Sequence, residues 1–245
     1  MIQAQQLTKV FRDRKRGEFR AVAGVSFTCQ PGQIYGLLGA NGAGKTTTLR
    51  MLATLLKPST GTAVVAGQDI VQVPELVRAS VGFLSAATAL YGRLTAREMV
   101  EYFGRLHGLA EDTLRSRVMQ IFSALEMNEF ADRRCDKLSS GMKQRVSIAR
   151  TLVHDPPVMI FDEPTNGLDV MTARAIIRFI RECKQRGKTV IFSTHVMNEV
   201  EKLCDQIGII HQGRLLAEGS LAELQAKYQE QDLEEIFVRV VGGEA

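Results

Sequence analysis

Eight consecutive residues read Gly39-Ala40-Asn41-Gly42-Ala43-Gly44-Lys45-Thr46. They match the P-loop pattern G-x-x-x-x-G-K-[ST] in full, after a short apolar segment and before a predicted helix. The glycines let backbone N–H groups turn inward around phosphate oxygens. We expect Lys45 to reach the β- and γ-phosphates and the Thr46 hydroxyl to bind Mg²⁺. The stretch therefore predicts a nucleoside triphosphate site.

A second motif places two carboxylates at the end of an apolar segment, Val158-Met159-Ile160-Phe161-Asp162-Glu163. A buried strand here would carry Asp162 to the sheet edge beside Thr46, where it would hold Mg²⁺. Glu163 would lie one step further, placed to take a proton from attacking water. Many strands end in acidic turns, so this motif alone does not indicate a metal site. It does so here because a complete P-loop precedes it.

Composition sets the class of protein. The chain has 245 residues, of which 45% are hydrophobic and 24% charged, and its net charge is +4. These values are typical of a folded globular protein and give no reason to expect a nucleic-acid partner. No apolar run approaches the roughly 18 residues needed to cross a bilayer, and the four cysteines lack zinc-type spacing. We expect a soluble intracellular chain with reduced thiols, whose membrane role would need a partner.

The order of segments predicts an α/β fold. Residues 1–35 alternate like antiparallel strands, with segments at 2–7 and 22–28, and from residue 34 short apolar strands alternate with helical stretches, as in a mostly parallel sheet. Capping boxes at Thr95 and Ser220 begin predicted helices, and Asp232 offers a third helix start. After it, one stripe of a helix is formed by Leu233, Ile236, Phe237, Val240 and Val241. We expect a P-loop NTPase core with an N-terminal antiparallel β subdomain and an inserted helical subdomain. The predicted division is core at 1–85 and 157–219, helical subdomain at 86–156, and helical tail at 220–245.

A third motif precedes the acidic one by a helix and a short loop: Leu138-Ser139-Ser140-Gly141-Met142-Lys143-Gln144-Arg145. Its small residues at a helix start form a second potential anion-binding end. Two phosphate-binding ends about a hundred residues apart suggest that each serves a different copy of the chain. The sequence lacks the guanine-reading N-K-x-D of a GTPase, and a small-molecule kinase would typically lack the third motif.

Five ordered motifs together resemble the ATP-binding cassette (ABC) ATPases, including Pro164-Thr165-Asn166-Gly167-Leu168-Asp169 and Phe192-Ser193-Thr194-His195. The resemblance covers most of the chain and identifies the third motif, residues 138–145, as the signature segment. It implies that the signature segment of one subunit closes over ATP held by the P-loop of another. It places Asp169 at the dimer seam and His195 on the γ-phosphate. It also makes Phe11 the aromatic residue stacked on adenine, although a core position would suit Phe11 nearly as well.

The expected site residues fall into three groups. Glu163, His195 and Lys45 are the catalytic candidates. Thr46 and Asp162 are the Mg²⁺ candidates. The ATP-binding candidates are Phe11, Gly39, Asn41, Gly42, Ala43, Gly44, Lys45, Thr46, Thr47, Ser139, Ser140, Gly141 and Asp169.

The sequence departs from the family pattern at three positions. Ala86 stands where glutamine is usual, Ser140 where glycine is usual, and Met142 where glutamine is usual. Alanine offers no side-chain oxygen to Mg²⁺ or water, so either Ser85, Thr88 or water substitutes, or hydrolysis is coupled more loosely. Hydroxyl and N–H donors survive in the signature segment, so we expect closure over ATP to be retained.

Local stretches at 88–98, 152–157, 167–171 and 233–239 resemble the ATPase subunits of bacterial sodium-efflux (Nat-type) ABC transporters, which work with a separate ABC-2 permease. The resemblance implies a homodimer at the cytoplasmic face of the cell membrane, attached to an integral-membrane permease and exporting sodium. An ABC-2 exporter of a drug, lipid or polysaccharide is the first alternative. A regulatory module that binds ATP without hydrolysing it is the second. A nucleic-acid role is not expected, because the spacing between P-loop and signature leaves no room for a long coiled coil.

Overall fold

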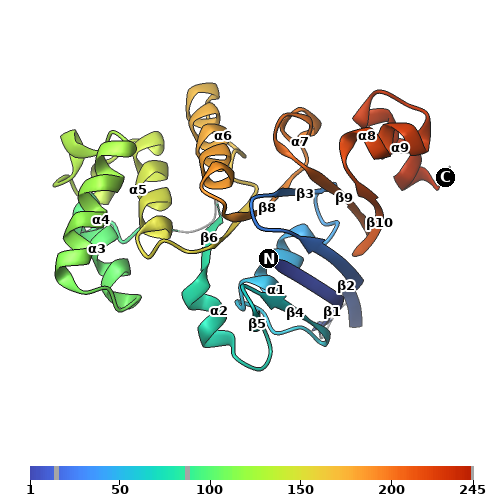
Figure 1. The fold of residues 1–245 in the computed structure, drawn as a ribbon, viewed down its shortest axis with the longest axis horizontal. Helices are drawn as coiled ribbons and strands as arrows, with labels where there is room; N and C mark the ends of the chain where they lie inside the picture. Colours follow the sequence, from blue (N-terminus) through green and yellow to red (C-terminus); the bar gives the residue numbers. More distant parts are fainter. Residues whose placement is uncertain (14–16, 86–88, 244–245) are drawn as a thin grey trace.

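The computed structural model describes residues 1–13, 17–85 and 89–243. Two sheets lie side by side at its centre, with helices around them (Figure 1). The larger has six strands in the order β10-β9-β3-β8-β7-β6, parallel except for β10, which runs antiparallel to β9. Their bounds are β3 Ile34–Leu38, β6 Val81–Ser85, β7 Val158–Asp162, β8 Thr189–Thr194, β9 Gln206–His211 and β10 Arg214–Gly219.

Both faces of the larger sheet are buried at its central strands β3, β7 and β8, which explains the unbroken apolar runs in those strands. On one face Tyr35 and Leu37 pack against α1 (Lys45–Leu52) and the second sheet. On the other face Ile34 and Leu38 join a cluster with residues of later helices. Those helices are α6 Val170–Gln185, α7 Met197–Leu203, α8 Leu221–Tyr228 and α9 Leu233–Gly242.

The second sheet is antiparallel, with the order β2-β1-β4-β5. Its strands are β1 Ile2–Asp13, β2 Gly17–Cys29, β4 Thr60–Val65 and β5 Gln68–Asp69, and α2 (Pro74–Ser80) follows them. The two predicted N-terminal strands are confirmed, but both are longer than 2–7 and 22–28. The extra residues form the outer part of the hairpin, where β2 is exposed to water at Gly17–Arg20 and carries no hydrophobic alternation.

Three helices form a separate cluster to the left of both sheets in Figure 1: α3 Ala96–Leu106, α4 Glu111–Ala124 and α5 Ser140–Leu152. They enclose a core of their own that includes Met99, Phe122 and Val146. The predicted capping box is present, since the Glu98 amide donates to Thr95 Oγ1 at 3.1 Å and the Thr95 amide to Glu98 Oε2 at 2.8 Å. The division into domains stays a prediction, although this cluster suits the helical part of it.

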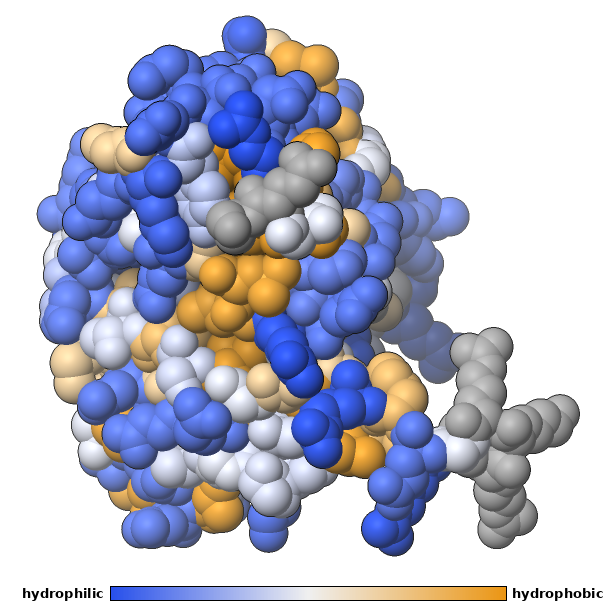
Figure 2. All heavy atoms as spheres, turned by 90° about the vertical axis from the view of Figure 1, so that its right-hand side faces the viewer, coloured by the Kyte–Doolittle hydropathy of each residue, from blue (hydrophilic) through white to orange (hydrophobic). Residues whose placement is uncertain are grey.

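The C-terminal helices α8 and α9 cover the end of the larger sheet, on the face that Figure 2 presents. Ser220 caps α8 and Asp232 caps α9, at the two predicted helix starts. Leu233, Ile236 and Val240 form the buried stripe of α9, as its spacing predicts. Within the described part of the chain, none of the helices is both long and apolar enough to pass through a membrane.

Candidate functional site

The P-loop runs from the end of β3 to the start of α1 and takes its shape from glycine. Gly42 and Gly44 have φ values of 81° and 107°, in the left-handed region that favours glycine. A Cβ on Gly44 would lie 2.6 Å from the Ala21 carbonyl oxygen of β2, too close for any other residue. The Gly213 amide, in the turn between β9 and β10, also donates to Ala43 O at 2.8 Å and so holds the loop from that side.

Lys45 points into this loop. Its side chain is 4% exposed, and Nζ donates to the carbonyl oxygens of Gly39 at 2.7 Å and Ala40 at 3.1 Å. Nζ also lies 3.1 Å from Glu163 Oε1. A buried ammonium needs such partners, because removing an unpaired charge from water is costly. The loop therefore concentrates one positive charge where phosphate oxygens would enter.

Thr46 and Asp162 meet at the edge of the larger sheet. Thr46 Oγ1 donates to Asp162 Oδ1 at 2.9 Å, and Ser193 Oγ donates to the same oxygen at 2.9 Å. Asp162 is 5% exposed and stands opposite Ser193 in the parallel β7–β8 ladder. A hydroxyl and a carboxylate are hard oxygen ligands of the kind Mg²⁺ prefers, so this pair fits a magnesium ion beside the phosphates. Sequence reasoning did not assign Ser193 a role at this carboxylate.

Glu163 lies just beyond Asp162 in a strained backbone conformation. Its φ of 46° is unusual for a residue with a side chain, and Ser193 holds it there by accepting from the Glu163 amide. Burial tends to raise the pKa of Glu163, but the hydrogen bond and charge of Lys45, with a contribution from His195, lower that pKa below its usual value. The carboxylate is thus held ionised, as a proton acceptor must be.

His195 is the third side chain beside this carboxylate. Its Nδ1 lies 3.6 Å from Glu163 Oε1, and its side chain is 41% exposed, so it remains accessible to solvent. On the other side, Asn166 Nδ2 donates to Glu163 Oε2 at 3.1 Å. The structure therefore brings together Lys45, Glu163 and His195, the three residues expected to be catalytic, within hydrogen-bond or near hydrogen-bond distance.

Four further sequence-predicted residues occupy two helix starts. Ser139 caps α5 by accepting from the Met142 amide at 3.3 Å, and Ser140 and Gly141 follow in its first turn. Asp169 caps α6 by accepting from the amides of Met171 and Thr172, each at 3.0 Å. The Thr172 hydrogen bonds lower the pKa of Asp169. Of the described residues that line the P-loop cavity, none comes from 139–141 or is Asp169.

The P-loop cavity has a volume of about 370 Å³. It is lined by Phe19, Ala21, Asn41, Gly42, Gly44, Lys45, Thr46, Thr47 and Glu163. Phe11 is absent from this lining and stacks on Phe19 instead, with ring centroids 5.6 Å apart and planes 20° apart. Sequence reasoning missed Phe19, because its place opposite Phe11 depends on the register of a long hairpin.

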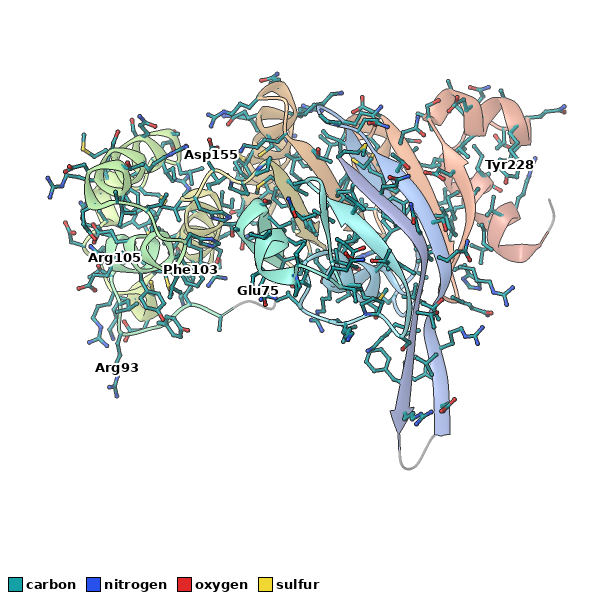
Figure 3. The ribbon with its side chains drawn as sticks, turned by 60° about the horizontal axis from the view of Figure 1, so that its bottom comes forward. Glu75, Arg93, Phe103, Arg105, Asp155 and Tyr228 are labelled. Carbon is teal, nitrogen blue, oxygen red and sulfur yellow. The ribbon has the colours of Figure 1, made fainter. Side chains whose placement is uncertain are left out.

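A larger cavity of about 690 Å³ lies at the seam between the core and the three-helix cluster. Its lining includes Phe103 and Arg150 from the helices and Arg50 and Arg78 from the core. Figure 3 shows Phe103 among the helices and Glu75 of α2 on the core side. Ala86, where the family usually has glutamine, and Thr88 lie outside the described residues. Ser85, the other side chain that could take the place of the glutamine, also lines this cavity.

Two histidines stack in the wall of this seam cavity. The rings of His107 and His154 are parallel to within 3°, with centroids 3.6 Å apart. His154 Nε2 lies 3.2 Å from the Val81 carbonyl oxygen, which can only accept, so Nε2 carries the proton. Nδ1 is buried without a hydrogen-bond partner among the described residues. Burial, and next the nearby His107, lower the pKa of His154 to about 4.

Comparisons with known proteins agree with this geometry. The family model described as ABC transporter matches residues 22–166. The ABC transporter ATP-binding protein NatA of Bacillus subtilis is 42% identical over 239 residues, 97% of each chain. The probable multidrug ABC transporter ATP-binding protein YbhF of Escherichia coli is 34% identical over 98% of this chain, which spans 42% of YbhF.

A solved structure is also similar throughout the fold. It is a dimer of the ATP-binding cassette MJ0796 in a post-hydrolysis state, bound to ADP and Pi. The two folds agree with a TM-score of 0.81 at 27% identity, over 90% of this chain and 98% of that one. The predicted α/β fold of the P-loop type is confirmed.

Proposed function

This chain belongs to the ABC transporter family, and from that premise we propose that it drives sodium export through a separate membrane permease. It is an ATP-binding subunit and an ATPase, as the sequence predicts. The resemblance of its local motifs to Nat-type sodium exporters supports the cargo. The multidrug relative supports the alternative of an ABC-2 exporter with an organic cargo.

In the proposed reaction, the loop amides and Lys45 bind the phosphates of ATP. Thr46 and Asp162 would hold Mg²⁺, which would neutralise charge on the phosphate oxygens. Because Lys45 pairs with Glu163, a phosphate that attracts Lys45 would release the carboxylate. Glu163 would then accept a proton from the attacking water, and His195 would contact the γ-phosphate beside it.

We propose that the second half of each ATP site comes from another copy of the chain. Ser139, Ser140 and Gly141 would supply N–H and hydroxyl groups at the start of α5, where the helix dipole favours an anion. Two observations support this arrangement: these residues do not line the P-loop cavity of their own chain, and the apolar Val170 and Met171 beside Asp169 are 68% and 73% exposed. Exposed apolar residues at a helix start suit a seam between two copies.

The permease would dock at the seam cavity, whose lining combines apolar residues such as Leu55 and Phe83 with polar ones, among them Arg50 and Arg78. Its lining includes Ala89, which belongs to the segment 86–97 that we expect to transmit ATP-driven closure. A cytoplasmic helix with apolar residues and a carboxylate would complement it. Attachment through such a helix would hold the chain at the cytoplasmic face of the membrane.

One observation carries the proposal: at the P-loop, Lys45 lies within hydrogen-bond distance of Glu163, and Thr46 donates a hydrogen bond to Asp162. The test is co-expression with the membrane protein encoded by the adjacent reading frame. We expect the two to copurify, ATP turnover to rise on association, and deletion of the pair to make cells sodium-sensitive. Drug sensitivity without sodium sensitivity would indicate an organic cargo in place of sodium and would leave the proposed ATPase mechanism unchanged. Absence of any copurifying permease would contradict the exporter.

A further inference from the structure

We propose that Asn166 is a positioning residue for ATP hydrolysis. Its side-chain amide holds one oxygen of the Glu163 carboxylate, so that the other oxygen is presented to the attacking water after ATP has drawn Lys45 away. The inference rests on Glu163 as the proposed base, and it gives a role to a residue whose function the motifs do not indicate.

The two oxygens of the Glu163 carboxylate have different partners. Oε1 lies beside two residues proposed to contact phosphate, with Lys45 Nζ at 3.1 Å and His195 Nδ1 at 3.6 Å. Oε2 accepts a hydrogen bond from Asn166 Nδ2 at 3.1 Å. Oε1 is therefore the oxygen on the side where the γ-phosphate and the attacking water would lie, and Asn166 holds the other one.

The place of Asn166 does not depend on the nucleotide. The described residues that line the P-loop cavity include Lys45 and Glu163 but not Asn166. The Asn166 backbone amide donates to Glu163 O at 3.2 Å and closes a four-residue turn. Pro164 is the second residue of this turn, where the fixed φ of proline is favourable. A phosphate that pairs with Lys45 would thus leave the hydrogen bond between Asn166 and Glu163 in place.

The backbone of Glu163 is already fixed from the other side. Its amide donates to the carbonyl oxygen of Ser193 at 3.2 Å and to the Ser193 hydroxyl at 3.1 Å. The freedom that remains to Glu163 is that of its side-chain torsions, which one hydrogen bond to Oε2 restricts. A general base must lie within hydrogen-bond distance of the water, and a misplacement of about 1 Å can cost about 100-fold in rate. Asn166 can therefore control the rate without touching the substrate.

Two substitutions separate the hydrogen bond from the shape of the turn. The full chain is assayed with Mg²⁺ over a range of ATP concentrations, and ATP binding is measured separately. Asn166→Ala should lower kcat by about 10- to 100-fold and leave KM and ATP affinity within about 2-fold of wild type. Asn166→Asp keeps the shape of the side chain but replaces the donor by a second carboxylate, which would repel Glu163. Its kcat should fall at least as far as that of Asn166→Ala.

Asn128 provides the matched controls, because it is an exposed asparagine that lies between α4 and α5. Asn128→Ala and Asn128→Asp make the same two chemical changes away from the P-loop cavity. Both variants should match wild type in kcat, KM and ATP affinity.

A double-variant cycle tests whether Asn166 acts through Glu163. In the Glu163→Gln background, adding Asn166→Ala should change single-turnover phosphate release by less than about 2-fold, because the base that it positions is gone. A merely structural role would give the same loss of rate in both backgrounds.

Three results would overturn the proposal: wild-type kcat in Asn166→Ala, a kcat of Asn166→Asp closer to wild type than that of Asn166→Ala, or equal losses of rate in the two backgrounds. Each can occur while Glu163→Gln abolishes turnover, so the proposed role of Glu163 would stand. Unchanged turnover in Glu163→Gln would instead remove the base itself, and it would overturn this inference as well.

Discussion

Lys45 Nζ lies 3.1 Å from Glu163 Oε1, within a loop whose carbonyl groups take the remaining hydrogen bonds of the ammonium. The residue proposed to bind phosphate and the residue proposed to activate water thus neutralise each other. A γ-phosphate would compete for Lys45, so Glu163 would gain freedom to act as a base only when a triphosphate is bound. This contact connects nucleotide binding with the timing of hydrolysis.

Glu163→Gln should slow phosphate release by roughly 100- to 10,000-fold, the range for loss of a general base. ATP affinity should be equal or higher, because Lys45 loses its internal counter-ion. Phosphate release and equilibrium nucleotide binding measure the two effects separately. Glu201→Gln, on the exposed side of α7, is the control and should match wild type. Unchanged turnover in Glu163→Gln would remove Glu163 from the role of base.

Ser193→Ala and Asp162→Asn should raise the Mg²⁺ concentration needed for half-maximal turnover. Asp162→Asn removes the charged ligand itself, whereas Ser193→Ala removes only the hydroxyl that orients it. Loss of such a supporting hydrogen bond typically costs about 10- to 100-fold in metal affinity, so Asp162→Asn should cost more. Turnover measured at increasing Mg²⁺ concentrations checks whether Asp162→Asn needs more Mg²⁺ than Ser193→Ala. Equal Mg²⁺ requirements in all three proteins would contradict the assignment of Asp162.

Folding stability should fall in mild acid because of His154. Its pKa is about 4 in the folded chain against an ordinary value of 6.5, so the unfolded chain binds the proton first. Stability is therefore full above pH 6.5 and declines as the pH drops from 6.5 toward 4, by about 3 kcal/mol in total.

His154→Gln should flatten this decline, since an amide can donate to Val81 O without titrating. Urea unfolding between pH 7.5 and 4.5 measures the difference, and His211→Gln, at the end of β9, serves as the control. A variant whose stability falls as steeply as wild type over this range would exclude His154 as the cause.

Ala86→Gln should leave ATP binding intact and alter the turnover that the permease stimulates. The reason is chemical: glutamine would supply a side-chain oxygen that Ala86 lacks, at a position expected to join the ATP site to the docking surface. Nucleotide titration of the isolated chain and ATPase assays of the assembled transporter give the two readings. Identical turnover of both proteins with permease present would mean that this position takes no part in coupling.

Much of the fold follows from local patterns. The P-loop, the apolar strands and the caps at Thr95, Ser220 and Asp232 each depend on neighbouring residues, which a sequence displays directly. The approach of Thr46 to Asp162 also follows, because the carboxyl ends of parallel strands meet at one edge of a sheet.

Other features depend on how segments far apart in the sequence pair and pack against each other. Phe19 reaches the cavity because a long, water-exposed hairpin places it opposite Phe11, and no hydrophobic alternation marks that hairpin. The stacked His107 and His154 lie in the turns that follow α3 and α5, and the packing of these two helices sets their contact. The Lys45–Glu163 pair depends on a side-chain conformation that the motifs leave open.

The mass of the Glu163→Gln protein with Mg²⁺ and ATP tests most directly whether two copies close over nucleotide. Sedimentation should show a species of twice the 27.1 kDa chain mass that returns to the single chain when nucleotide is removed. Ser140→Arg, which would block the start of α5, should abolish the larger species while leaving ATP bound. A single-chain mass for Glu163→Gln under these conditions, both alone and in complex with the permease, would contradict the proposed mechanism.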